Sequence, residues 1–98
     1  MSQNFVEINS NKSYATGDLT GASSSTGIKV PSRTIGVLVT ADASTDIDIE
    51  VSNDGTNWYI HPDATAITTT SAVVISVPFI YIRATQTGAG TGSVIFTW

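Results

Sequence analysis

The sequence predicts an all-β fold, a single antiparallel β-sandwich of the jelly-roll type with about seven or eight short strands. β-branched residues dominate the chain: fifteen Thr, eleven Ile and nine Val stand against two Leu and two Glu in 98 residues. Such side chains lose freedom in a helix but pack well on a pleated surface. Apolar and polar residues also alternate in several short segments, and turn residues separate these segments at regular intervals.

Segment 46–51 gives the clearest strand. Apolar and acidic residues alternate along it without a break, with Ile47, Ile49 and Val51 at every second position. Because successive side chains of a strand point to opposite faces, these three residues share one face. We therefore expect a half-buried strand here.

The opposite face of this strand carries three carboxylates, those of Asp46, Asp48 and Glu50. We expect them to be solvated and to discourage association of strand edges. Two alternatives stay open. A calcium ion would need Asp42 or Asp54 as further ligands. An ion pair would need Arg33 or Arg83 of a neighbouring subunit.

Further segments have the strand period of two or enough β-branched residues to form a strand. They are 4–9, 28–31, 34–40, 73–77, 79–85 and 93–98. Segments 34–40, 73–77 and 79–85 carry apolar residues on both faces, so we expect interior strands there. In the last segment Val94, Phe96 and Trp98 share one side, and Ile95 lies on the other.

Turn residues separate these strands. The stretch 21–27 is rich in Gly and Ser, which predicts a flexible loop. Asn53, Asp54 and Gly55 predict a hairpin turn, because Gly tolerates positive φ and Asn and Asp bond their own backbone. His61 precedes a proline in another turn between strands, where we expect an exposed polar residue. The Gly-rich stretch 88–92 is expected to close the final hairpin.

Composition argues against several functions. Four Lys and Arg stand against eight Asp and Glu, and this net charge of −4 would repel nucleic-acid phosphates. The chain has no Cys and one His, so disulfides, thiolate metal sites and most nucleophilic triads lack their residues. We expect no enzyme activity, no cofactor, no catalytic residue and no metal site. Short apolar runs and the absence of an export pattern predict no membrane association and no export.

Phe79, Tyr81 and Arg83 alternate with Ile80 and Ile82, so the two sets point to opposite faces. In a sandwich of two layers, only one set can face the core. One interpretation places Phe79 and Tyr81 in the core and covers the two Ile residues with a loop or the N-terminal arm. The other makes Phe79, Tyr81 and Arg83 a patch at a subunit contact, a composition typical of interface centres.

The strand 46–51, the turn of Asn53, Asp54 and Gly55, the following Trp58 and the segment 79–84 together resemble two groups of β-sandwich proteins. One comprises the small structural proteins of tailed bacteriophage virions, such as head decoration (cement), fibre and neck proteins. The other, less similar, comprises discoidin-like carbohydrate-binding modules. We expect the turn to return Trp58 to the apolar face of strand 46–51, together with Ile60.

The phage resemblance implies a non-enzymatic capsid decoration or cement subunit on the outer surface of the virion. It implies a homo-oligomer, a trimer by preference, that contacts the major capsid protein or another virion protein. We expect one domain over residues 1–98, with 1–12 as an N-terminal arm. Phe5, Val6 and Ile8 are expected to donate an edge strand from this arm to a neighbouring subunit.

Two alternatives follow from the same residues. A glycan-binding module would need Trp58, Tyr59 and Tyr81 exposed together, and the short Gly-, Ser- and Thr-rich loops match no sugar-contacting residue of the discoidin-like modules. An adhesion domain of an extracellular or cell-surface assembly would be a monomer, which separates it from the decoration subunit.

Overall fold

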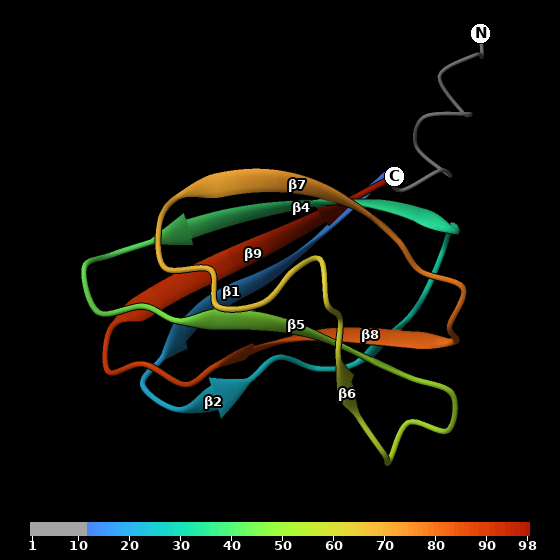
Figure 1. Ribbon diagram of the computed structural model, residues 1–98, viewed down its shortest axis with the longest axis horizontal. Helices are drawn as coiled ribbons and strands as arrows, with labels where there is room; N and C mark the ends of the chain where they lie inside the picture. The colour runs from blue at the N-terminus through green and yellow to red at the C-terminus, as the bar shows by residue number, and fades with distance from the viewer. Residues whose placement is uncertain (1–11) are drawn as a thin grey trace, which may run out of the picture.

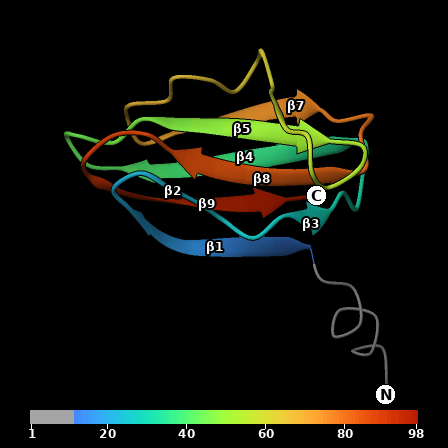
Figure 2. The same ribbon diagram turned by 90° about the horizontal axis from the view of Figure 1, so that it is seen from below.

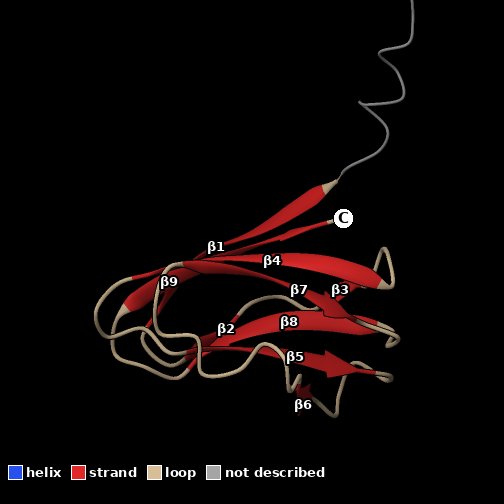
Figure 3. Ribbon diagram, turned by 45° about the horizontal axis from the view of Figure 1, so that its top comes forward, coloured by secondary structure: helices blue, strands red, loops and turns tan. Residues whose placement is uncertain are grey.

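The computed structural model describes residues 12–98, which form two antiparallel sheets packed face to face, as Figure 1 and Figure 3 show. The first sheet contains, in order, β1 (Ser13–Thr20), β9 (Thr91–Thr97), β4 (Thr34–Ala41) and β7 (Ser71–Ser76). In the second, β2 (Ser23–Ser24) and β3 (Ile28–Lys29) share one edge and are followed by β8 (Tyr81–Gln86), β5 (Ile47–Ser52) and β6 (Tyr59–Ile60). No helix occurs among the described residues. The predicted all-β sandwich is confirmed.

The strand order is that of a jelly roll. Strands from opposite ends of the chain pair, so β1 lies beside β9 and the edge formed by β2 and β3 lies beside β8. Further in, β4 lies beside β7, and β5 beside β6. The chain is thus a long hairpin folded at the β5–β6 turn and rolled into two layers, and the pairs β4–β9 and β5–β8 complete the layers.

The core lies between the sheets and takes every second residue of the longer strands. β4 buries Ile35, Val37 and Val39 in one layer. The facing strand β5 buries the predicted set of Ile47, Ile49 and Val51, and β9 adds Val94 and Phe96. A slip of one residue would turn these side chains to solvent, so burial fixes the register of each pair.

β1 has no counterpart in the sequence expectation. Its register with β9 shifts between Ala15 and Asp18, where Gly17 has a φ of 76°. This β-bulge breaks the period of two, and only Leu19 of the strand is buried. The expected strand at 4–9, and the arm as far as residue 11, lie outside the described residues.

Two further strands differ from expectation. Part of the stretch 21–27 forms β2 instead of a flexible loop, because Ser24 pairs with Thr85 of β8 and the Ser25 N–H donates to the Ala84 carbonyl at 2.8 Å. β7 lies at the edge of its sheet, although its two apolar faces predict an interior strand. Figure 2 shows β7 and β1 on opposite edges of the molecule.

The Gly-rich stretch 88–92 does not close a hairpin. β8 and β9 belong to different sheets, so this stretch carries the chain from one layer to the other. Gly suits the crossing because of close packing: a Cβ on Gly88 would clash with the Ser44 carbonyl, and one on Gly90 with the Asp42 carboxylate. Asp42 Oδ2 in turn accepts a hydrogen bond from the Thr91 N–H at 2.9 Å.

The two layers are also joined by one buried polar side chain, that of Gln86. Its amide nitrogen donates to the carbonyls of Leu19 in β1 and Gly90, at 3.3 and 3.1 Å. Its Oε1 accepts from the N–H groups of Asp46 and Gly88, at 2.7 and 3.0 Å. All four hydrogen-bonding sites of the amide are therefore used at the crossing.

Candidate functional site

The outer face of the first sheet carries a row of apolar side chains that runs across all four strands. Register places Ala15 of β1 beside Ile95 of β9, Ile95 beside Leu38 of β4, and Leu38 beside Ala72 of β7. Val74 lies two residues further along β7 on the same face. We call these five residues the apolar outer face.

Solvent reaches this face directly. Leu38 is 42% exposed, Val74 69% and Ile95 39%. Asp18 is the only charged residue within the four strands as the structure describes them. Most outward positions around the apolar row are instead Ser and Thr, for example Thr40 opposite Ser93, and Asp18 lies beside Ser93 on the other side. An exposed apolar surface with a single charge at its rim is typical of an interaction site.

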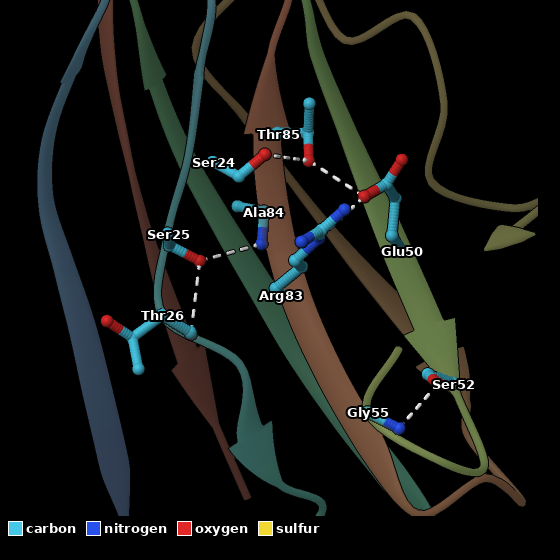
Figure 4. A network of polar contacts seen from close by, with 9 residues as sticks. All are labelled: Ser24, Ser25, Thr26, Glu50, Ser52, Gly55, Arg83, Ala84 and Thr85. Atoms are coloured by element: carbon cyan, nitrogen blue, oxygen red, sulfur yellow. Dashed lines mark hydrogen bonds and ion pairs between the residues drawn. The ribbon is translucent and has the colours of Figure 1, made fainter. Parts of the chain in front are cut away.

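The outer face of the second sheet carries polar and charged side chains along β8 and β5. Arg83 of β8 and Glu50 of β5 stand opposite each other, and Arg83 Nε lies 2.7 Å from Glu50 Oε1. Thr85 donates to the same oxygen at 2.9 Å and is itself in contact with Ser24 of β2 at 3.0 Å. Figure 4 shows this chain of contacts across three strands. It corrects the expectation for Glu50, which is half-buried and paired with Arg83 of the same chain instead of being solvated. An ion pair of this face with Arg33 of a neighbouring subunit stays a prediction.

Trp58 packs on this polar face. The Arg83 guanidinium carbon lies 4.3 Å from the centroid of the Trp58 ring. Gly27 touches the same ring closely, since a Cβ there would come within 2.8 Å of it. The expected packing of Trp58 and Ile60 on the apolar face of β5 is therefore wrong. Glu50 pairs with Ile60, so Ile60 shares the outer face and is 52% exposed.

The predicted turn follows β5 and leads to the antiparallel pairing of β5 with β6, as expected. Gly55 has a φ of 77°, which an L side chain rarely adopts. The Asp54 carboxylate accepts the N–H groups of Asn57 and Thr56, each at 2.8 Å, together with the Asn57 side-chain amide and the Ser52 hydroxyl. These hydrogen bonds, with that from the Asn57 N–H first, lower the pKa of Asp54. The carboxylate is thus a structural anchor of the turn.

Phe79, Tyr81 and Arg83 all lie outside the buried core, and their role at a subunit contact stays a prediction. Ile82 and Ala84 are buried, whereas Phe79 is 38% exposed, so the interpretation that places Phe79 and Tyr81 in the core is wrong. Phe79 lies at one end of the sandwich, where it lines two shallow hollows of about 370 and 240 Å³. Tyr81 is half-buried against the turn at Gly55.

His61 is buried, not exposed as its place before a proline predicts. Its Nδ1 accepts the Asp63 N–H at 3.1 Å. Nε2 therefore carries the proton of the neutral ring and donates to the Ser76 carbonyl of β7 at 2.7 Å. Both ring nitrogens hold the connection between β6 and β7 in place, and this connection brings the side chain inside.

The structure thus groups the predicted residues in a new way. The turn residues Asn53 and Asp54 line the smaller hollow together with Phe79, and Gly55 lies beside Tyr81. Phe5, Val6 and Ile8 lie outside the described residues, and their expected role stays a prediction. Sequence reasoning missed the apolar outer face. Its signal was present in the two-sided apolar pattern of β4 and β7, which is also the pattern of interior strands.

Within residues 12–98, no three His, Asp or Glu side chains come close enough together to hold a metal ion. A search of the described residues found no helix with the length and apolarity needed to cross a membrane. Comparisons with protein-family models, with curated proteins and with solved structures found no match for this chain. The two outer faces of the sandwich and its strand edges are the candidate sites of function.

Proposed function

We propose that this chain is a non-enzymatic structural subunit that docks on the outer surface of a larger particle, with the capsid of a tailed bacteriophage as the particle implied by the sequence resemblance. In this proposal it acts as a decoration or cement subunit, works as a homo-oligomer and contacts the major capsid protein or another virion protein. The observation that carries the proposal is the apolar outer face of β1, β9, β4 and β7.

Desolvation favours the first sheet as the docking side. Burying a charge in a contact is costly unless it is paired, whereas burying apolar surface is favourable by about 25 cal/mol per Å². The apolar outer face offers Leu38, Val74 and Ile95 with Asp18 as the only charge in its four strands. The opposite sheet carries the Glu50–Arg83 pair and suits solvent. The two sheets thus favour opposite environments, as in a subunit that lies flat on a shell.

A mass-resolved inventory of particles purified from the source of the sequence tests the proposal first. The chain should be present in many copies per particle. Particles stripped of the chain are then reloaded with purified protein. Leu38→Lys places a charge at the centre of the apolar outer face, and we expect at least tenfold weaker loading.

Thr56→Lys is the matched control, because it adds the same charge on the exposed turn after β5. This variant should load like the wild type. Absence of the chain from the particles, or equal loading of Leu38→Lys and the wild type, would overturn the proposal.

A second candidate function, glycan binding, is favoured by one observation. Tyr59 is 68% exposed and, with Asn53, Asn57 and Phe79, lines the smaller hollow at the end of the sandwich. An exposed aromatic ring beside amide groups suits a sugar ring and its hydroxyls. Trp58 does not contribute a stacking platform, since Arg83 lies over its ring.

A glycan array with the wild type and Tyr59→Ala tests this candidate. Binding that disappears in Tyr59→Ala and persists in Leu38→Lys would favour the glycan module over the decoration subunit. Absence of binding across the array would remove the candidate.

A further inference from the structure

The four strand edges of the sandwich differ in how well they are protected against pairing with another strand. The β1 edge is interrupted by the bulge at Gly17 and carries Asp18. The edge of β2 and β3 consists of two pieces of two residues each, and β6 has two residues. β7 alone is long and regular: six residues, Ser-Ala-Val-Val-Ile-Ser, without charge, Gly or Pro.

Register shows which backbone groups of β7 face away from the sheet. The Val77 N–H donates to the Arg33 carbonyl at 2.7 Å, and Ile75 pairs with Ile35 and Val73 with Val37. In an antiparallel ladder, alternate residues bond to the same neighbour. The odd-numbered residues of β7 therefore bond to β4, and the N–H and C=O groups of Ala72, Val74 and Ser76 point outward.

One of these outward groups is already used. The Ser76 carbonyl accepts the hydrogen bond from His61 Nε2 at 2.7 Å, so the buried ring closes that end of the edge. At the other end β7 begins at Ser71, which makes Ala72 the first outward residue. Within the described part of the chain, the N–H and C=O groups of Ala72 and Val74 have no hydrogen-bond partner. Both side chains are exposed, Val74 to 69%.

We propose that β7 pairs antiparallel with β7 of a second copy of this chain, across a two-fold axis that places Ala72 opposite Val74 of the partner subunit. Four hydrogen bonds then form, two for each Ala72–Val74 pair, and they use all four groups of Ala72 and Val74 in each copy. The sheet β1-β9-β4-β7 continues into its counterpart as one sheet of eight strands, and the two apolar outer faces become one surface.

The unpaired N–H and C=O groups of Ala72 and Val74 favour a second copy of the chain as the partner of the β7 edge. Two residues of one strand, each with one free donor and one free acceptor, are complementary to themselves under a two-fold axis, the commonest symmetry of homo-oligomers. β7 carries no charge to oppose an identical strand. The contact goes beyond the proposed function, since it depends on the strand edge and not on the docking face. It yields dimers, and thus competes with the trimer implied by the resemblance.

Sedimentation of the full chain over about 10 µM to 1 mM tests the pairing, because an edge contact alone is smaller than the interfaces of tight complexes. The wild type should dimerise within this range. Val74→Pro removes a free N–H and puts a ring on the edge without touching the bonds to β4, and we expect at least tenfold weaker dimerisation. Leu38→Lys, which alters the docking face alone, should dimerise like the wild type.

A wild type that stays monomeric to 1 mM, a folded Val74→Pro variant that dimerises normally, or loss of dimerisation in Leu38→Lys would each overturn the pairing. The same variants separate it from the proposed function. Leu38→Lys is expected to lose particle loading and keep the dimer. If it loads normally while Val74→Pro loses the dimer, the proposed function fails and the edge pairing stands.

A cross-link reports the register and does not depend on how Val74→Pro folds. In the proposed register, Val73 lies opposite Val73 of the partner subunit, at a non-hydrogen-bonded position with about 4.5 Å between Cα atoms, within the range of a disulfide. The chain has no Cys, so Val73→Cys introduces one thiol per copy. Under mild oxidation it should cross-link at least fivefold faster than Val74→Cys, its matched control. Equal rates, or a faster Val74→Cys, would overturn the proposed register.

Discussion

Gln86→Leu removes the one buried amide that joins the two layers while it keeps most of the side-chain volume. The amide makes four hydrogen bonds, but the free-energy cost of losing them differs from one bond to the next. The Gly90 carbonyl also accepts from the Gly21 N–H at 3.0 Å and keeps that bond. The N–H groups of Asp46 and Gly88 lose the acceptor that holds them at 2.7 and 3.0 Å.

The magnitude follows from these two donors. A buried donor left without an acceptor costs about 1–3 kcal/mol. Asp46 is half-exposed, so water can replace the lost acceptor of its N–H and reduce this cost. We expect Gln86→Leu to lower the free energy of unfolding by about 3 kcal/mol, which for a domain of this size lowers Tm by about 12–24 °C.

Urea unfolding followed by far-UV circular dichroism measures this change. The control is Thr87→Ala, the exposed neighbour whose hydroxyl lies 3.5 Å from the Asp46 carbonyl; it should change stability by less than about 0.5 kcal/mol. If Gln86→Leu were equally harmless, the amide would not hold the layers together, and the reasoning from its hydrogen bonds would be refuted.

Three further variants test other parts of the structure. His61→Ala leaves the Ser76 carbonyl and the Asp63 N–H without their partner, and urea unfolding should show a loss of about 2 kcal/mol; a loss below about 0.5 kcal/mol would contradict this. Trp58→Ala removes the ring under the Arg83 guanidinium and should lose about 2 kcal/mol, whereas Trp58→Phe should recover part of it. The hydrogen bonds that lower the pKa of Asp54 favour its ionised form, so this stabilisation is fully present above about pH 4 and is lost as pH falls further. Asp54→Asn should therefore be less stable than the wild type at pH 7, and its urea midpoint should fall less between about pH 4 and pH 2; equal falls would contradict the assignment.

Sequence reasoning found the strands that alternate cleanly. β5 is the best example, because Ile47, Ile49 and Val51 fall at every second position and all three are buried. The wrong predictions concern segments whose conformation depends on contacts with residues far away in the sequence. Residues 88–92 have the composition of a hairpin turn, yet they cross between sheets, since the close packing of Gly90 against Asp42 is visible only in three dimensions.

In the candidate site, too, the sequence predicts the local pattern but not the tertiary environment. The apolar residues of β4 are evident in the sequence, but an apolar residue on the second face of a strand indicates either an interior position or an exposed contact surface. Leu38 proves exposed because no third layer covers the first sheet among the described residues. For Glu50 the sequence predicts a solvated carboxylate, but the side chain is paired. Its partner Arg83 lies 33 positions away on the adjacent strand, so the pairing is not visible in the sequence.

By itself, then, the sequence determined the class of fold, because β-branched content and a period of two are local properties that act through each residue's own backbone and nearest neighbours. Only the tertiary structure decided which strand lies at an edge, which apolar face meets solvent and which carboxylate is paired. These properties depend on the pairing of distant segments, such as β1 with β9 or β4 with β7. Such a pairing cannot be predicted from the local sequence pattern of either strand.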